Sequence, residues 1–253
     1  MENIQCIICS RNSSFHYLKL SDRLSTTSKV FNLVKCTCGF IYLNPRPINA
    51  AMSQHYRTEN YDPHEMSSTG IWNIIYRFIQ RITFRWKYRI MRHYIKSGSL
   101  LDIGGGNGEF AEYVHGKGWI VTMQDSFLDV ARENISSTFI SELSELNLSE
   151  KFNVITLWHS LEHIHKINKL FNSLDNLLQD SGIIMIAVPN LNAPERKFYK
   201  QLWAPYDAPR HLYHFNFYQL NKLCRQKGYE IIQKYSMYQD LPYNVLLSMP
   251  NYF

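Results

Sequence analysis

A run of glycines between an apolar segment and a helix-like segment is the feature that most constrains the fold of this chain. Residues 100–103 read LLDI, residues 104–108 read GGGNG, and a helical pattern covers 107–117. Glycine allows tight turns and close approach of a ligand to the main chain. The first N–H groups of a helix lack intrahelical partners and attract negatively charged groups. This order predicts a strand, a ligand-binding turn and a helix within an α/β domain.

The glycine spacing distinguishes two classes of nucleotide cofactor. Nicotinamide enzymes use G-x-G-x-x-G, and counting from Gly104 puts Glu109 at the third glycine, where its acidic side chain would sit poorly beside a pyrophosphate. The pattern Asp102-x-Gly104-x-Gly106-x-Gly108 instead resembles the first motif of class I S-adenosylmethionine (SAM)-dependent methyltransferases. The resemblance implies that SAM is the cofactor and that this loop holds its methionine end. The loop residues expected to contact SAM are Asp102, Gly104, Gly105 and Gly106.

A second acidic residue, Asp125, follows the apolar segment 119–124. A carboxylate accepts two hydroxyl protons and therefore suits a ribose diol, and dinucleotide folds place such an acid about 20 residues after the glycine loop. Because the glycine loop precedes it, we expect Asp125 to bind the ribose, with the adjacent Ser126 also at the cofactor. The alternative is that Asp125 is the N-cap of a helix over 126–135.

Two further segments resemble motifs of the same methyltransferases. Residues 152–164 resemble the family's fourth strand and its "LEH" turn, and residues 183–190 resemble a fifth strand that ends in "VPN". Ligands of such sheets bind at the carboxyl ends of the strands. We therefore expect Trp158 and His159 to lie beside the cofactor.

Short apolar segments alternate with helical patterns from residue 99 onward, which predicts a parallel sheet with crossover helices. Together with the family resemblance, this implies an α/β, Rossmann-like fold with a seven-stranded methyltransferase sheet. The expected strands are 99–103, 119–124, 138–140, 152–158, 183–188, 229–237 and 244–249, and the expected helices are 107–117, 126–135, 166–179 and 216–227.

Four of the five cysteines form two close pairs near the N-terminus. Such pairs favour a metal site over disulfides in a chain without a secretion signal, and thiolates suit tetrahedral zinc. The segment resembles the zinc-ribbon-like start of a methyltransferase subgroup, although that subgroup has two residues inside the second pair, where this chain has one. His16 is therefore a candidate replacement ligand, and buried free thiols are the alternative explanation. The expected zinc ligands are Cys6, Cys9, Cys36 and Cys38.

The sequence divides into three regions. Two prolines in 44–47 (NPRP) exclude a helix and end a cysteine-rich zinc-binding module over 1–47. A helical cap is expected over 48–97 and the methyltransferase domain over 98–253. Within the cap, 71–96 has apolar residues at helical spacing and arginines every four residues on another face. Three roles are open for this basic amphipathic helix. It covers the core with its arginines in solvent, or it docks on an anionic membrane surface, or it reaches toward a phosphorylated substrate.

Methyl transfer to a hydroxyl requires the protein to align the acceptor and to remove a proton. Histidine is the usual base near neutral pH. His211 lies in 209–215 (PRHLYHF), which resembles a segment of the zinc-containing subgroup, and His163 lies in the "LEH" turn. We expect His211 first and His163 second as the catalytic base. For either histidine, the alternative is a packing or capping role.

The zinc-containing subgroup includes methyltransferases of bacterial sugar and glycan pathways. It implies that the acceptor is a sugar hydroxyl of a nucleotide-linked sugar or glycan, and the net charge of +6 agrees with a phosphorylated substrate. The alternatives are a lipid or quinone-like molecule methylated at a membrane surface, an RNA and, least expected, an inactive zinc-ribbon adaptor. No dense Lys/Arg run is present, so we do not expect a nucleic-acid partner. Residues 1–10 lack a basic start followed by an apolar run, so we expect a cytoplasmic chain.

Overall fold

The chain forms two units in the computed structural model. The described residues are 1–24, 29–56, 71–126, 136–147 and 149–249. Residues 1–64 and 189–253 make up unit 1, and residues 65–188 make up unit 2. Each unit is described by itself below.

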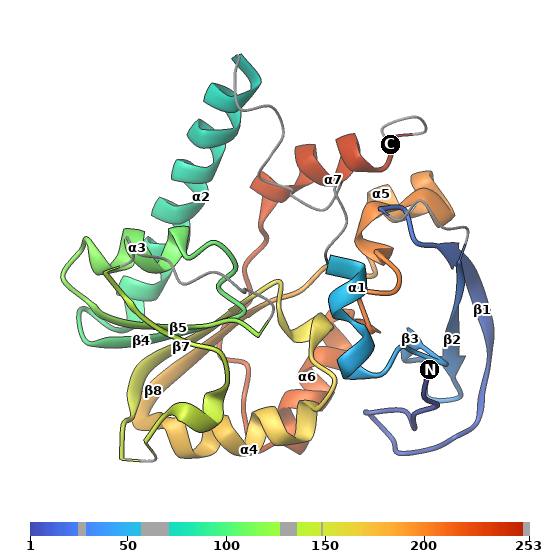
Figure 1. Cartoon of the computed structure of the whole chain (residues 1–253), viewed down its shortest axis with the longest axis horizontal. Helices are drawn as coiled ribbons and strands as arrows, with labels where there is room; N and C mark the ends of the chain where they lie inside the picture. Colours follow the sequence, from blue (N-terminus) through green and yellow to red (C-terminus); the bar gives the residue numbers. More distant parts are fainter. Residues whose placement is uncertain (25–28, 57–70, 127–135, 148, 250–253) are drawn as a thin grey trace. The chain divides into compact units, whose positions relative to one another are not determined.

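Unit 2 contains a parallel sheet with strand order β6-β5-β4-β7-β8. Its strands are β4 (Ser99–Ile103), β5 (Ile120–Gln124), β6 (Thr138–Ile140), β7 (Phe152–Trp158) and β8 (Leu178–Ala187). Because all neighbours run parallel, the carboxyl ends of the strands meet at one edge of the sheet (Figure 1). The strand order reverses at β4, which pairs with both β5 and β7, and such a switch point is where open α/β sheets bind ligands.

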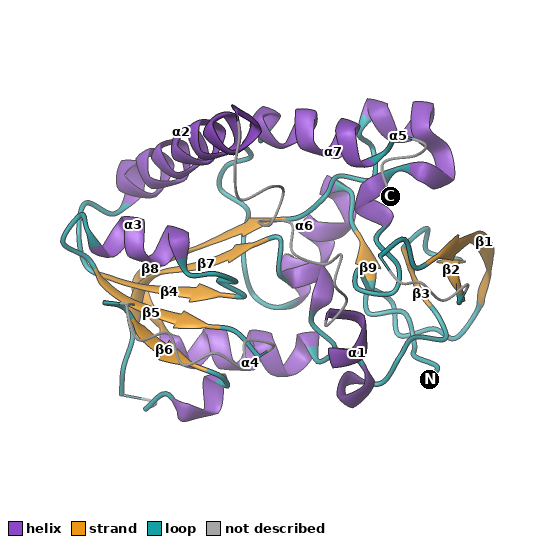
Figure 2. Ribbon diagram, turned by 45° about the horizontal axis from the view of Figure 1, so that its top comes forward, coloured by secondary structure: helices purple, strands orange, loops and turns teal. Residues whose placement is uncertain are grey.

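Helices cover both faces of this sheet, which agrees with the apolar character of most residues of its central strands β4, β5 and β7. Figure 2 shows α3 (Glu109–His115) on one face and α4 (Ile167–Leu177) on the other. Phe110 and Val114 of α3 are buried in one cluster with Val121 of β5, and α2 (Ile71–Tyr94) packs on this cluster through the buried Met91. Two short 3₁₀ segments complete the unit, η2 (Leu143–Glu145) and η3 (Leu161–His163).

Unit 1 contains an antiparallel sheet with order β1-β2-β3-β9. Its strands are β1 (Ser14–Ser21), β2 (Val30–Cys36), β3 (Ile41–Leu43) and β9 (Tyr213–His214), and its helices are η1 (Asn49–Ala51), α1 (Ser53–Tyr56), α5 (Pro194–Tyr199), η4 (Lys200–Leu202), η5 (Ala204–Tyr206), α6 (Phe217–Gln226), η6 (Tyr238–Asp240) and α7 (Leu241–Leu247). Buried aromatic side chains hold β3 to β9, because the rings of Tyr213 and Phe215 both pack on Phe40. Asn216 caps α6 by accepting the N–H of Gln219.

The sequence predicted the order of the first five strands of the parallel sheet and the helices α3, α4 and α6. The strand predicted over 229–237 is wrong, because those residues form no strand and expose apolar side chains such as Ile232, at 66%. The strand predicted over 244–249 is also wrong, since most of it belongs to helix α7, which has a proline in its first turn. The described part of the sheet thus has five strands rather than seven. The helix expected over 126–135 lies outside the described residues after Ser126.

The three regions read from the sequence are distributed differently over the two units. Strand β9 comes from the predicted methyltransferase domain and pairs with β3 of the predicted zinc module, with Ile41 opposite His214. Residues 189–253 therefore share a unit with the cysteine-rich module. In the described ranges, no helix has both the length and the apolar character that crossing a membrane requires.

Candidate functional site

The glycine loop turns the chain from the end of β4 into α3. The N–H groups of Gly104 and Gly105 donate to the carbonyl oxygen of Gln124 at 2.8 and 3.1 Å, which ties the loop to the end of β5. Gly104, Gly106 and Gly108 have φ values of +71°, +52° and +73°, in the left-handed region that favours glycine. The backbone conformation of this turn therefore explains the glycine-rich sequence.

The space around the loop differs from one glycine to the next. A Cβ atom added to Gly104 would lie 2.4 Å from the Cβ of Ser160, whereas one added to Gly106 would meet no atom within 4 Å. Gly104 is thus required for packing against the residues that follow β7. Gly106 leaves open space beside the main chain, as a backbone that receives a ligand must.

Alanine at these two glycines should separate folding from cofactor binding. Gly104→Ala should lower the thermal stability strongly, because its Cβ overlaps Ser160 and φ is positive. Gly106→Ala should cost only the left-handed strain, about 1–2 kcal/mol, yet weaken SAM binding because its methyl group fills the open space. Thermal unfolding and isothermal titration with SAM measure both effects. Wild-type SAM affinity in Gly106→Ala would contradict a ligand site at this position.

Asp102 is a buried carboxyl group near the end of β4, and its Oδ1 atom accepts the hydroxyl proton of Thr156 at 2.6 Å. Burial raises the pKa of Asp102 to about 6, against the opposing effects of the Thr156 hydrogen bond and of the charge of Lys87. A positively charged ligand group beside this carboxylate would offset its desolvation. The position is therefore suited to a ligand ammonium group.

Asp125 follows β5 and contacts the glycine loop directly. Its Oδ2 atom accepts the N–H of Gly106 at 3.0 Å, so the structure brings the first and second sequence motifs together. Ser126 lies next to it, accepts a hydrogen bond from Gln124 at 2.9 Å and donates one to the carbonyl oxygen of Ser141 at 3.2 Å. Asp125 and Ser126 thus lie at the carboxyl edge of the sheet.

The end of β7 supplies a second wall at the same edge. Trp158 is the last residue of β7, and His159 follows with a positive φ of 55° and with its Nδ1 3.7 Å from Oε1 of the buried Glu162. Among the described residues, Trp158 Nε1 and Ser160 Oγ are buried without a hydrogen-bond partner. Buried polar groups are normally paired, so two such donors beside the glycine loop indicate a ligand-binding edge.

The four predicted zinc ligands lie together in unit 1. Cys6 Sγ is 3.6 Å from Cys38 Sγ, Cys9 Sγ is 3.4 Å from Cys36 Sγ, and all four sulfur atoms lie within 4.8 Å of one another. A tetrahedral zinc ion with Zn–S bonds of about 2.3 Å separates its sulfur ligands by about 3.8 Å, so the cluster has the dimensions that zinc requires. His16 lies on β1 with an exposed side chain and is not part of the cluster.

The thiols of this cluster differ in acidity. Burial raises the pKa of Cys6 and of Cys38. The pKa of Cys36 is instead lowered to about 7, because hydrogen bonds from the Cys38 N–H and the Cys9 thiol outweigh its burial. The lowered pKa favours the thiolate form of Cys36, which is the form that binds a metal.

His211 is held in a defined tautomer within unit 1. Its Nδ1 atom lies 2.8 Å from the carbonyl oxygen of Pro205, and its main-chain N–H donates to the carbonyl oxygen of Asp207 at 2.9 Å. A carbonyl oxygen only accepts, so Nδ1 carries the proton and Nε2 of the neutral ring carries the lone pair. His163, the second candidate base, ends η3 in unit 2 and is half-buried.

The residue before His211 is the centre of a buried ionic network. The Arg210 guanidinium donates to both carboxylate oxygens of Asp207 through Nε, at 3.0 and 2.9 Å, and to Asp22 through Nη1 at 3.0 Å. His55 contacts the other oxygen of Asp22 through Nδ1 at 2.9 Å. The network thus connects residues 207–210, which precede β9, with Asp22 and His55. These contacts hold the backbone next to His211 in place.

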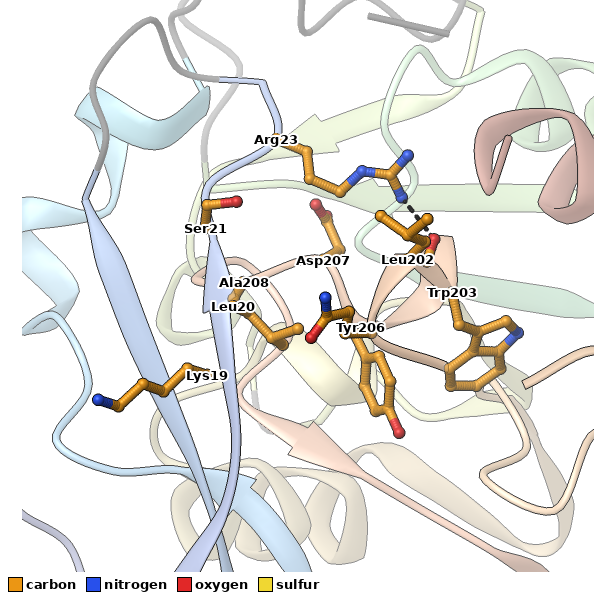
Figure 3. A pocket seen from close by; sticks show the side chains of 10 residues that line it. Lys19, Leu20, Ser21, Arg23, Leu202, Trp203, Tyr206, Asp207 and Ala208 are labelled. Atoms are coloured by element: carbon orange, nitrogen blue, oxygen red, sulfur yellow. Dashed lines mark hydrogen bonds between the residues drawn. The ribbon is translucent and has the colours of Figure 1, made fainter. Parts of the chain in front are cut away.

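A polar pocket opens beside this network. Figure 3 shows Ser21 and Arg23 on one side and Tyr206 and Asp207 on the other, with the Arg23 guanidinium donating to the carbonyl oxygen of Leu202 at 3.0 Å. The pocket combines hydroxyl, charged and aromatic groups within unit 1. Its lining thus mixes polar, charged and aromatic residues.

A family described as "Methyltransferase domain" matches residues 51–234. The chain belongs to this methyltransferase family. The match includes the glycine loop, Asp125, the "LEH" turn and His211. The α/β fold, the parallel sheet and the loop geometry described above agree with a class I SAM-dependent methyltransferase domain.

Individual methyltransferases are similar to parts of the chain. The ubiquinone biosynthesis O-methyltransferase of Glaesserella parasuis serovar 5 (strain SH0165) is 31% identical over 109 residues, which cover 37% of this chain and 46% of that protein. The chain therefore matches about half of the length of this relative. Among solved structures, the 1,6-didemethyltoxoflavin-N1-methyltransferase of Burkholderia thailandensis, with bound S-adenosylhomocysteine, has a TM-score of 0.47 at 20% identity and covers 59% of this chain and 68% of its own. A SAM-dependent methyltransferase from Archaeoglobus fulgidus has a TM-score of 0.49 at 17% identity, with coverages of 63% and 74%.

The methyltransferase loop has room and partners for SAM. The carboxyl groups of Asp102 and Asp125 lie beside the glycines, and a Cβ atom at Gly106 would meet no atom within 4 Å. When bound, SAM supplies a methyl group that its sulfonium has already activated for transfer. Two groups at this edge, Lys87 and Ser160, were not predicted from the sequence. Lys87 lies in a helix whose basic residues were assigned to solvent or to partners, so only its burial in the fold distinguishes it.

Proposed function

We propose that this chain transfers the methyl group of SAM to a hydroxyl group of a small molecule, with His211 as the base. The observation that carries the proposal is the tautomer of His211, because its Nδ1–H···O=C bond to Pro205 leaves the lone pair on Nε2. As the methyl–oxygen bond forms and the methyl–sulfur bond breaks, Nε2 takes the proton of the acceptor hydroxyl. His163 remains the second candidate for this role.

The other residues of the proposed site bind and orient. The carboxylate of Asp125 would accept the ribose hydroxyl protons in place of the Gly106 N–H, and Asp102 would pair with the ammonium group. Main-chain atoms of Gly104, Gly105 and Gly106 would line the methionine end. These assignments come from the family resemblance and are supported by the contacts among the loop, β5 and β7.

The first candidate acceptor is a sugar hydroxyl of a nucleotide-linked sugar or glycan. The resemblance of the cysteine module and of 209–215 to sugar-pathway methyltransferases supports it, as does the net charge of +6. The pocket lined by Ser21, Arg23 and Asp207 supports it as well, because hydroxyl and charged groups are suited to the hydroxyl groups of a sugar (Figure 3).

The second candidate acceptor is a quinone-like lipid at a membrane surface. The exposed face of α2 supports it, because Phe78 and Ile82 are 63% and 45% exposed beside the exposed Arg81 and Arg85, a pattern suited to an anionic interface. The curated relative named above acts in ubiquinone biosynthesis. We do not propose RNA as the acceptor, because no described feature favours it.

Transfer of labelled methyl groups into a fractionated cell extract distinguishes these acceptors. The full chain is incubated with labelled SAM, and label is counted in the nucleotide-sugar, glycan, lipid and RNA fractions, with Asp125→Ala as the control. Label in a sugar fraction that is absent with the control supports the first candidate. Label in the lipid fraction, with vesicle binding that is lost in an Arg77/Arg81/Arg85 alanine variant, supports the second. Absence of SAM binding would contradict the proposed function as a whole.

We also propose that Cys6, Cys9, Cys36 and Cys38 hold one structural zinc ion. Four protein ligands leave no open coordination position, so the ion would stabilise the fold rather than take part in the reaction. The sulfur–sulfur distances of 3.4 and 3.6 Å support this assignment.

Removal of one thiolate ligand should release the zinc. The full chain should contain about one zinc per molecule by elemental analysis, and Cys36→Ser should lose it together with several kcal/mol of stability, on the order of what structural zinc contributes. Cys224→Ser is the matched control, since Cys224 is a buried free thiol outside the cluster. Equal zinc contents in the two variants would contradict the site.

A further inference from the structure

Lys87 is a buried cation in a helix whose other basic residues are mostly exposed. Its side chain is 9% exposed, whereas Arg81, Arg85 and Arg89 of the same helix α2 are exposed. Removing an ammonium group from water is costly unless other groups compensate. Its burial therefore sets Lys87 apart from the exposed arginines of the same helix.

The surroundings of Lys87 place its charge at the carboxyl edge of the parallel sheet. Its Nζ atom lies 4.6 Å from the ring centroid of Trp158 and 5.3 Å from that of Phe110. Trp158 is the last residue of β7, and Phe110 lies in the first turn of α3, directly after the glycine loop. The aromatic faces attract the cation, so Lys87 is held between the two elements that flank the loop.

The charges at this edge are complementary to an amino-acid group. The methionine end of SAM carries an ammonium group and a carboxylate. Asp102 and Asp125 supply negative charge at the loop, and Lys87 supplies the positive charge close enough to influence the ionisation of Asp102. The unpartnered Trp158 Nε1 and Ser160 Oγ independently indicate that a polar ligand reaches the end of β7.

We propose that the Lys87 ammonium binds the α-carboxylate of the cofactor and so positions its methionine end against the glycine loop. The proposal rests on the proposed use of SAM as cofactor. A purely structural Lys87, whose charge serves the aromatic rings and Asp102 within the folded chain, is the rival explanation. The two explanations differ in whether the effect of Lys87 depends on the ligand's carboxylate.

Decarboxylated SAM tests this dependence, because it lacks only the carboxylate. Isothermal titration of the full chain should give about 10–100-fold tighter binding of SAM than of decarboxylated SAM, as a charge-assisted hydrogen bond of about 1.5–3 kcal/mol predicts. Lys87→Met, which keeps the length and the apolar packing of the side chain, should abolish that preference and leave the affinity for decarboxylated SAM within about twofold of wild type. Lys87→Arg should retain most of the preference.

Each variant is compared with itself on the two ligands, so a loss of folded protein does not imitate the expected result. Lys117→Met is the matched control, since Lys117 is exposed and lies 5.5 Å over the ring of Tyr113, and it should keep the full preference. If Lys87→Met keeps the wild-type preference for SAM, the inference is overturned. Equal loss of affinity for both ligands would in that case indicate a structural role. Failure of the wild-type chain to bind either ligand would instead contradict the proposed function.

Discussion

Replacing Arg210 with methionine should lower the free energy of unfolding by about 3–5 kcal/mol, as expected when one partner of a buried ion pair is removed. Arg210 and the side chain of Asp22 are 0% exposed, and the guanidinium is in contact with two carboxylates and with the carbonyl oxygen of His55. The variant leaves Asp22 and Asp207 without their shared cation in a poorly solvated position. Urea-induced unfolding followed by circular dichroism measures the loss.

Two further variants test whether the charge network causes this loss. Arg225→Met changes an exposed arginine on α6 and should alter stability by no more than about 0.5 kcal/mol. Combining Arg210→Met with Asp22→Asn should cost less than the sum of the two single changes, because the second change removes a charge that the first left unpaired. An additive result, or a loss below about 1 kcal/mol in Arg210→Met, would mean that the network contributes little to stability.

Replacing His211 with alanine should lower kcat by about 10²–10⁴-fold, the usual contribution of general-base catalysis. The affinity for SAM should stay within about twofold of the wild-type value, since the glycine loop belongs to unit 2 and His211 belongs to unit 1. These kinetic measurements use the acceptor that is identified by methyl labelling of the cell extract.

His16→Ala and His163→Ala complete this experiment. His16 is exposed on β1 and should leave kcat unchanged. If His163→Ala lowers kcat by this factor while His211→Ala leaves kcat unchanged, the base is His163. If neither variant lowers kcat, the proposed proton transfer to His211 or His163 is wrong.

The features recognised from the sequence depend on short stretches of chain. The glycines of 104–108 were predicted to form a turn, and three of them have a positive φ. A positive φ is a local property of the backbone that favours glycine. The cysteine pairs were predicted to converge, and their sulfur atoms do lie within 4.8 Å of one another. Such motifs are readable because turn conformation and ligand chemistry restrict residue type at fixed spacing.

The predictions that failed concern segments whose structure depends on distant partners. The alternation over 229–237 resembles a strand, but a strand forms only where another strand offers its hydrogen-bonding groups, and the structure pairs none with it. The apolar residues over 244–249 fit a helix as well as a strand, because a short apolar segment does not determine its own period.

Thus the amino-acid sequence by itself determined the methyltransferase loop, the two cysteine pairs and the first five strands of the parallel sheet. The tertiary structure alone decided that β9 joins the N-terminal sheet, that Arg210 is buried between Asp22 and Asp207, and that Lys87 faces two aromatic rings instead of solvent. The reason is physical: a local motif depends on backbone geometry over a few residues, whereas burial of a charge depends on groups that lie far apart in the chain and meet only in the folded protein.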